Sequence, residues 1–513
     1  MGIYTNTFED NSQSRFAYES EIKQLPMVDH KKKTCSGGGV IIKSDGITSY
    51  VDNSDRNTMV VGTTGSKKTR NIILPSIISS IISGDTMIIN AMKDDVIDYT
   101  YDMLKKNGYN IIFLNFRNPD QSECFNVLSE IEEIYRFGQE DTAIQMMKSL
   151  FENLFSAVES KTDALWSRQS AAYAVGLGII ILDEYPEGSL SIDNIYNLHM
   201  QISRDDTLLI EYIDLKRNKT QAYKQIYPVL ASEGGTKASY YSVFSAGLAP
   251  YVVSDSIIKM TSYSSFQVSD IVDEKTAIFI MNNEFNTAYY PLISCTIDMI
   301  YSSLGLISEQ QGGLISRETG EKRRVRFIID EFGSMTSINH FSEKISLSRG
   351  RGISWLLVCQ SLDQLELRYE KCAARNIITN CDNICYLHTP DDELLKIISE
   401  RCGEVYDEEK CKDVPLCSKD LLRHLDKEKG ECLWILGSMY PYITHLPDIS
   451  EYYGIVETKQ SYVQTRKRKS KQIKDFDEIL LNLRMKRKME KQRRKEKREI
   501  FRLECEEDDK PFT

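Results

Sequence analysis

Eight residues near the start of the chain have the composition of a phosphate-binding loop. The stretch GTTGSKKT (62–69) follows TMVVG, a short apolar run typical of a buried strand. Backbone N–H groups of such a turn face an anion, and the following helix adds the positive end of its dipole. Lys68 would then reach the β- and γ-phosphates of ATP, and the Thr69 hydroxyl would bind Mg²⁺. The rest of the predicted loop consists of Gly62, Thr63, Thr64, Gly65, Ser66 and Lys67.

Lys67 departs from the expected pattern, because a second glycine fills its position in GxxxxGK[ST]. A side chain there would obstruct the phosphates or require a backbone conformation that glycine adopts more easily. Pro75 predicts a kink or distortion in the first turns of the following helix. The alternative is a Ser/Thr/Gly turn with two solvated lysines, but the strand and helix around the loop favour a phosphate site.

Two adjacent carboxylates, Asp330 and Glu331, end the apolar run VRFIIDE. Residues that follow a parallel strand lie at the sheet edge where ligands of open α/β folds bind. Asp330 would hold Mg²⁺ through water, and Glu331 would orient or deprotonate the attacking water. Alone, such a pair is more often a solvated strand end or a helix start. Together with the phosphate loop it indicates a nucleotide site.

The elements that must position these residues read as a mostly parallel sheet covered by helices. Eight short apolar runs, typical of buried strands, are expected at 58–62, 86–90, 110–116, 276–282, 325–330, 353–359, 383–387 and 432–437. Helical patterns lie between them, as at 96–106 and 393–402, so the alternation predicts a three-layer α/β architecture.

The chain is expected to have five parts. An N-terminal segment with a small hairpin covers 1–55, and the nucleotide-binding domain is divided into 56–125 and 271–455. Between these halves, residues 126–270 read largely helical and predict an all-α insertion. Residues 456–513 form a charged tail in which a long exposed helix is expected at 475–500.

Composition narrows the classes of function. The net charge of −11 hides a basic stretch from Arg466 to Arg498, which suits nucleic acid, although a solvated helix or a docking arm for an acidic protein remains open. The cysteines show no paired CxxC motifs, and the sequence contains neither a recognisable signal peptide nor an uninterrupted apolar run long enough to span a bilayer. We expect a cytoplasmic protein, with peripheral membrane association possible through partners.

Seven motifs in one order give the chain a resemblance to the TraG/TraD-type coupling proteins of type IV secretion. They are GTTGSKKTR, LNFRNPDQSECFNVL, DALWSRQSAAYAVGLGIIIL, IIDEFGSM, SLSRGRGIS, CQSLDQL and NCDNICYL. The resemblance covers about residues 36–450. It implies a RecA-like P-loop NTPase fold with an inserted all-α domain, and a hexameric ATPase that moves DNA in bacterial conjugation.

The resemblance also implies roles for further residues. Gln360 is similar to the family's γ-phosphate sensor, and Arg349, favoured over Arg351, to an arginine presented to the neighbouring subunit's nucleotide. Expected partners are DNA or a relaxase–DNA complex, conjugation channel proteins at the inner membrane, and further copies of the chain. Two departures are the loop AMKDD, which retains only Lys93 and an acid of the family's DPKGE, and the expected lack of an N-terminal membrane anchor.

The leading hypothesis is therefore an ATP-driven coupling motor. A nucleotide-binding adaptor with impaired hydrolysis is a second hypothesis, because of Lys67 and the altered AMKDD loop. A DNA translocase of the partition or packaging type would share the same core.

Overall fold

The computed structural model describes residues 14–156, 164–216, 220–283, 286–459 and 471–508. The chain divides into two compact units, one formed by residues 1–123 with 265–466 and the other by 124–264 with 467–513. The packing therefore groups the end of the chain with the helical insertion, and the N-terminal segment with the nucleotide-binding core. The five-part division expected from the sequence remains a prediction. The basic cluster RKRK, at 466–469, lies outside the described residues.

A nine-stranded sheet forms the centre of the first unit, in the order β15-β14-β11-β5-β10-β9-β6-β8-β7. Its strands are β5 (Thr58–Gly62), β6 (Thr86–Ala91), β7 (Asn110–Asn115), β8 (Thr276–Met281), β9 (Val325–Ile329), β10 (Ile353–Cys359), β11 (Asn383–His388), β14 (Glu431–Ile435) and β15 (Tyr442–His445). The strands from β11 to β7 are parallel, whereas β14 and β15 run antiparallel at one edge. All eight predicted strands are present, and β15 is the one described strand of this nine-stranded sheet that was not expected.

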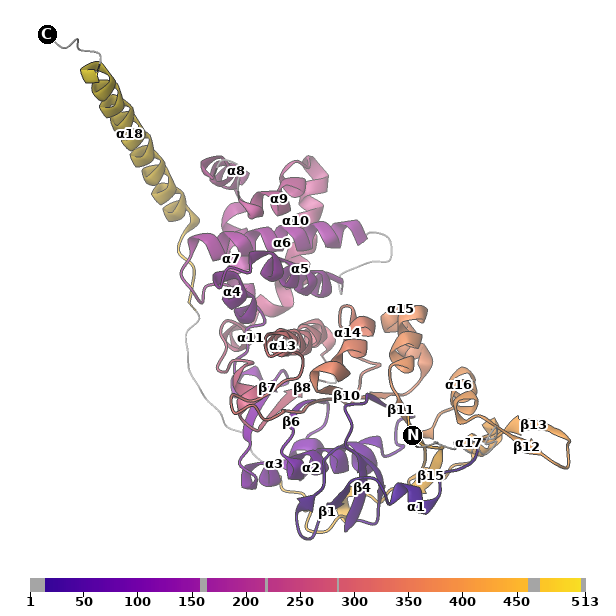
Figure 1. Ribbon diagram of the computed structural model, residues 1–513. Helices are drawn as coiled ribbons and strands as arrows, with labels where there is room; N and C mark the ends of the chain where they lie inside the picture. Colours follow the sequence, from indigo (N-terminus) through magenta and orange to yellow (C-terminus); the bar gives the residue numbers. More distant parts are fainter. Residues whose placement is uncertain (1–13, 157–163, 217–219, 284–285, 460–470, 509–513) are drawn as a thin grey trace, which may run out of the picture. The chain divides into compact units, whose positions relative to one another are not determined.

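Helices cover both faces of this sheet (Figure 1). One face carries α2 (Leu74–Ser83) and α3 (Asp95–Lys106), and the other carries α13 (Tyr290–Gln310), α14 (Phe341–Ser348) and α15 (Leu362–Thr379). Right-handed crossovers require this division, because the chain crosses the sheet in one direction from β5 to β7 and returns from β8 to β11. The unit also contains the α-helices α1 (Glu19–Ile22), α12 (Asp270–Asp273), α16 (Asp392–Cys402) and α17 (Lys419–Arg423).

A small four-stranded sheet, β2-β1-β4-β3, precedes the core. It contains β1 (Met27–Asp29), β2 (Thr34–Cys35), β3 (Val40–Ser44) and β4 (Thr48–Asp52), and the predicted hairpin corresponds to β3 and β4. The hydroxyls of Ser79 and Ser76 on α2 accept hydrogen bonds from the N–H groups of Gly39 and Ile41, so the small sheet is fixed to the helix that follows the phosphate loop. A separate hairpin, β12 (Glu404–Asp407) with β13 (Lys412–Pro415), follows α16.

Every secondary-structure element assigned among the described residues of the second unit is a helix. Its helices are α4 (Ser129–Arg136), α5 (Glu140–Ser156), α6 (Ala164–Glu184), α7 (Ile192–Ile202), α8 (Asp206–Leu215), α9 (Gln221–Leu230), α10 (Gly234–Val252), α11 (Asp255–Thr261) and α18 (Phe476–Asp508).

The first turns of α18 dock on this helical unit. The side chains of Phe476, Ile479 and Leu480 are buried, and Arg484 donates two hydrogen bonds of 2.5 Å to the Glu211 carboxylate of α8. The tail, predicted to be an exposed helix, is thus anchored at its start.

Within the part of the chain that the structure describes, two helices are long and apolar enough to cross a membrane by length and composition, Leu165–Glu184 and Thr287–Gln310. The helix Leu165–Glu184 extends beyond the apolar run at 171–182, which is by itself too short to span a bilayer, so the sequence did not predict it as a candidate. Since 72% and 78% of their apolar windows are buried inside the protein, both have the environment of core helices.

Candidate nucleotide-binding site

A cleft of about 560 Å³ opens at the carboxyl ends of the central strands. Such a position, next to the point where crossovers change direction, is where open α/β sheets bind ligands. Its lining consists of Thr64, Gly65, Ser66, Lys67, Lys68, Thr69, Arg70, Met92, Lys93, Asp95, Asp330, Glu331 and Ser334. The predicted phosphate loop and the predicted acidic pair therefore lie around one cavity.

The loop backbone turns twice through the left-handed region. Gly65 has φ +79°, which glycine adopts without cost, but Lys67 has φ +58°, which costs a residue with a side chain about 1–2 kcal/mol. The Lys67 ammonium donates to the Glu428 carbonyl at 2.9 Å, in the loop before β14. The loop thus requires a left-handed backbone at the position where glycine is usual. Lys67 adopts this conformation at a cost in strain, and its side chain contacts Glu428, which is distant in the sequence.

The helix after the loop begins with a widened, π-helical turn at Thr69–Ile73 and becomes α-helical at Leu74. Pro75 explains the distortion, because it has no N–H to donate to the carbonyl four residues earlier and its ring would collide with that carbonyl. The sequence predicted a kink or distortion here, and the structure shows a distortion, the π-helical turn that follows the loop.

Lys68 is buried, with 7% of its surface exposed. Its ammonium donates to the carbonyls of Gly62 at 2.7 Å and Thr63 at 2.9 Å. Burial lowers the pKa of Lys68, while the nearby carboxylates of Glu331 and Asp330 act in the opposite direction. A cation held in a low-dielectric pocket beside the loop is suited to bind phosphate oxygens.

Thr69 and Asp330 face each other across the cleft. The Thr69 hydroxyl lies 3.1 and 3.3 Å from the two oxygens of the Asp330 carboxylate, which is only 6% exposed. Burial, followed by the charge of Glu331, raises the pKa of Asp330 to about 6. A hydroxyl and a carboxylate form the oxygen donor set that Mg²⁺ prefers, so these residues fit a magnesium ion bound together with substrate phosphates.

Gln360 follows β10 and links the loop to the acidic pair. Its carbonyl oxygen accepts from the Thr64 hydroxyl at 3.1 Å, and its amide nitrogen donates to Glu331 at 3.3 Å. Ser334 also donates to Glu331 at 3.3 Å. The carboxamide therefore contacts both groups that would surround a γ-phosphate and its attacking water.

Arg349 is not part of this cleft. It precedes β10 whereas Gln360 follows it, and a seven-residue strand spans roughly 23 Å at about 3.3 Å per residue. Arg349 therefore lies at the amino ends of the parallel strands, whereas the cleft lies at their carboxyl ends. It cannot reach a nucleotide bound to its own subunit.

Sequence reasoning missed two contributors to the site. Arg70 lines the cleft and forms a two-point ion pair with Asp448 at 2.6 and 2.7 Å, and its only signal was its place directly after the loop. Glu428 gives no sequence signal, because its contact with Lys67 joins positions 361 residues apart. Lys93, the residue retained from the altered AMKDD loop, also lines the cleft.

Comparison with known proteins places this geometry in a family. The family described as type IV secretory system conjugative DNA transfer matches residues 9–411 of the chain. The chain belongs to this family. Among curated relatives, the type IV secretion system-coupling protein VirD4 of Bartonella henselae is 22% identical over 396 residues, covering 75% of this chain and 58% of the relative. The VirD4 protein of Rhizobium rhizogenes is 21% identical over 361 residues, covering 69% and 50%. The chain thus spans about half the length of these relatives.

Solved structures of the family show the same fold. The plasmid coupling protein TrwB in complex with the non-hydrolysable ATP analogue ADPNP aligns with a TM-score of 0.63 at 16% identity, covering 88% of this chain and 96% of TrwB. TrwB in complex with ADP and Mg²⁺ aligns with a TM-score of 0.63 at 15% identity, with the same coverage. The predicted fold class, a RecA-like P-loop NTPase with a mostly parallel sheet and an all-α insertion, is confirmed.

Proposed function

We propose that this protein is an ATP-driven coupling protein that recruits DNA or a relaxase–DNA complex and moves it to a type IV secretion channel. The observation that carries the proposal is the convergence of Lys68, Thr69, Asp330, Glu331 and Gln360 on one cleft in a member of the conjugative DNA transfer family. The proposal that the cleft binds ATP and Mg²⁺ is supported by the structures of TrwB, which has been solved with an ATP analogue and with ADP and Mg²⁺.

Each residue of the cleft would have a separate role in ATP hydrolysis. Lys68 would leave the loop carbonyls and bind the β- and γ-phosphates, while Thr69 and Asp330 would hold the Mg²⁺. Bound Mg²⁺ would neutralise charge on the phosphates. Glu331 orients the attacking water or removes its proton, and Gln360 connects that water to the phosphate loop through Thr64.

Completion of the site requires a second subunit. Arg349 lies about one strand length from its own cleft, which is compatible with the role that the family resemblance implies for it, on the nucleotide of a neighbour, where a guanidinium would stabilise charge in the transition state. A closed ring, a hexamer by analogy with the family, supplies such an arginine to every cleft. The protein would work in the cytoplasm, next to channel proteins at the inner membrane.

A second candidate function is a nucleotide-binding adaptor that hydrolyses ATP poorly. It is favoured by the strained Lys67, which has a side chain where the phosphate-loop pattern has glycine. In this case the protein would recruit substrate to an active coupling ATPase.

Steady-state ATP hydrolysis with and without single- and double-stranded DNA tests the proposal. DNA is expected to stimulate turnover, and Lys68→Ala is expected to abolish both turnover and ATP binding. Tight ATP binding without turnover would favour the adaptor, whereas absence of ATP binding by the wild-type protein would refute both functions.

A further inference from the structure

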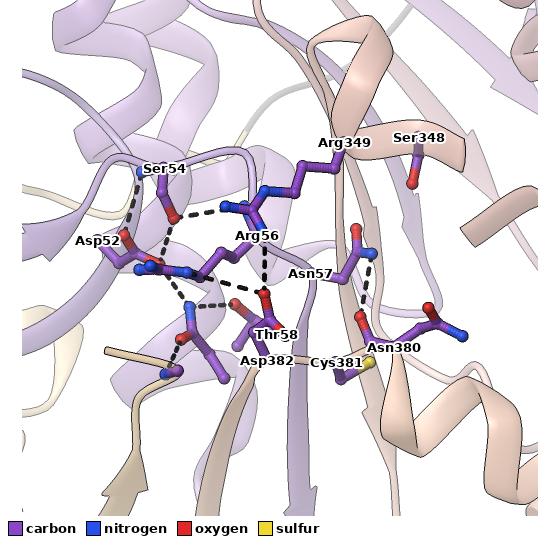
Figure 2. A network of polar contacts seen from close by, with 12 residues as sticks. Asp52, Ser54, Arg56, Asn57, Thr58, Ser348, Arg349, Asn380, Cys381 and Asp382 are labelled. Atoms are coloured by element: carbon purple, nitrogen blue, oxygen red, sulfur yellow. Dashed lines mark hydrogen bonds and ion pairs between the residues drawn. The ribbon is translucent and has the colours of Figure 1, made fainter. Parts of the chain in front are cut away.

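A polar network surrounds Arg349 at the amino ends of the central strands (Figure 2). It is built from the residues just before β5, the end of α14, the end of α15 and the residue just before β11. The first of these segments matters most, because β5 is the strand that ends in the phosphate loop. One strand therefore has the nucleotide cleft at one end and the Arg349 network at the other.

The side-chain amide of Asn57 connects three parts of the network. It is only 4% exposed, and its side-chain amide donates to the carbonyls of Ile345 in α14 at 3.0 Å and Asn380 after α15 at 3.2 Å. Its side-chain oxygen accepts from the N–H of Trp355 in β10 at 3.1 Å. A single buried amide thus fixes the helix that presents Arg349 to the strand that carries the phosphate loop.

The two arginines of the SRGRG turn have different surroundings. Arg351 is bound within its own subunit, since its guanidinium contacts Glu309 of α13 at 2.5 Å and its side chain is 21% exposed. Arg349 is 59% exposed, and its Nη1 lies 3.4 Å from Asp382. Of the two, Arg349 is therefore the one with donors available for a group outside its own subunit.

Asp382 lies between two cations. The same carboxylate oxygen contacts Arg349 and, at 3.8 Å, the Nε of Arg56. The backbone of Gly437 packs closely behind this pair, because a Cβ added there would come within 3.0 Å of the Asp382 Cβ and 3.5 Å of Arg56. The backbone of Gly437 thus packs against the Cβ side of Asp382, while the Asp382 carboxylate faces the guanidinium of Arg349.

An exposed ion pair of this kind is weak. It does not lock Arg349, but it limits the directions in which the long side chain extends. Contact through one terminal nitrogen leaves the other N–H groups of Arg349 free for a phosphate.

We propose that Asp382 is a positioning residue for Arg349, which it directs from the sheet edge towards the nucleotide of the adjacent subunit. The inference rests on the proposed ATPase function. In that function Arg349 contacts the neighbour's nucleotide, and Asp382 orients Arg349 for this contact. Arg56 shares the carboxylate and keeps it in place, and Asn57 sets the position of the helix end.

The test compares Asp382→Ala, Arg349→Ala and the double variant in the full chain by steady-state ATP hydrolysis. Arg349→Ala is expected to lower kcat by about a hundredfold or more. Asp382→Ala is expected to lower kcat about three- to fivefold, the effect of losing one exposed ion pair, with KM for ATP unchanged. In the Arg349→Ala background the second substitution should have no further effect, because both act through one group. Asp382→Glu should restore turnover.

Asp392→Ala is the matched control, since Asp392 forms a comparably exposed pair with Arg423 and lies outside the cleft lining and the Arg349 network. It should leave kcat unchanged, and all variants should retain the wild-type Tm. If turnover is too slow to measure, ATP-dependent assembly serves as the readout, with the same order of variants expected.

The possible failures differ in meaning. Unchanged kcat in Asp382→Ala, or an equal loss with and without Arg349, would overturn the positioning role alone. Unchanged kcat in Arg349→Ala would overturn the trans-acting arginine of the proposed function, and the positioning role with it. Loss of turnover in Lys68→Ala would still establish the nucleotide cleft in either case.

Discussion

The side-chain amide of Gln360 lies between the Thr64 hydroxyl, 3.1 Å from its oxygen, and the Glu331 carboxylate, 3.3 Å from its nitrogen. The phosphate loop and the acidic strand, separated by more than 260 residues in the sequence, are therefore joined through this carboxamide as well as through the hydrogen bond between Thr69 and Asp330. A movement of Thr64 on nucleotide binding would reach Glu331 through the Gln360 side chain.

Replacement of Gln360 by Ala should lower kcat roughly ten- to a hundredfold while the affinity for ATP stays close to wild type, because the amide positions water rather than binding the nucleotide. Gln360→Glu should be at least as damaging, since it places a second negative charge against Glu331. Turnover and nucleotide binding measured on the same preparations would check this. A loss of affinity that accounts for the whole effect would contradict it.

Lys67→Gly should stabilise the protein relative to Lys67→Ala by about 1 kcal/mol, because both variants lack the ammonium and only glycine relieves the left-handed backbone. Denaturant unfolding of the two variants isolates the backbone effect. If the side chain also obstructs hydrolysis, both variants should turn over faster than wild type. Equal stability of the two variants would show that the backbone at this position is unstrained.

Asp330 should make stability depend on pH. Burial raises its pKa from 3.8 to about 6, so the folded protein binds this proton more tightly than the unfolded chain does. The free energy of unfolding should therefore fall as pH rises through this interval, by up to about 3 kcal/mol at roughly 1.4 kcal/mol per pKa unit. Asp330→Asn should consequently have a higher Tm than wild type at pH 8 without Mg²⁺, and the difference should vanish near pH 4. Asp392→Asn, an exposed acid, should show no such trend.

The amount of fold that the sequence predicts depends on how apolar each element is. The buried strands β5 to β11 consist of β-branched and aromatic runs, and their strong signal gave the correct sheet. By contrast, β15 (Tyr442–His445) and the β12–β13 hairpin are short and partly exposed, so no apolar run marks them.

The site divides in the same way. Lys68, Asp330 and Gln360 directly follow strands or lie in a recognisable loop, so local spacing was sufficient to bring them together. The surroundings of Arg349 could not be predicted, because they are formed by residues distant in the sequence. Asp382, which contacts Arg349, and Asn57, which contacts the helix before it, are each more than 30 residues from their partners. The docking of α18 was missed for a related reason, since its few apolar residues stand beside a long run of charge.

Phe476→Ala should detach the start of α18 from the helical unit. The ring is fully buried and lies 5.8 Å from that of Tyr212, and truncation of a buried Phe typically costs about 3–5 kcal/mol. Limited proteolysis should then cleave the tail much faster than in the wild type. Leu481→Ala is the matched control on the same helix, because its side chain is exposed. Equal cleavage of both variants would argue against docking.

The most direct test of the central claim is ATP hydrolysis by Glu331→Gln, with ATP binding measured on the same sample. The proposed roles predict wild-type affinity for ATP with Mg²⁺ and a loss of turnover of about a hundredfold or more, because Glu331 acts on the attacking water and not on the bound phosphates. Retention of wild-type turnover by Glu331→Gln would contradict the account.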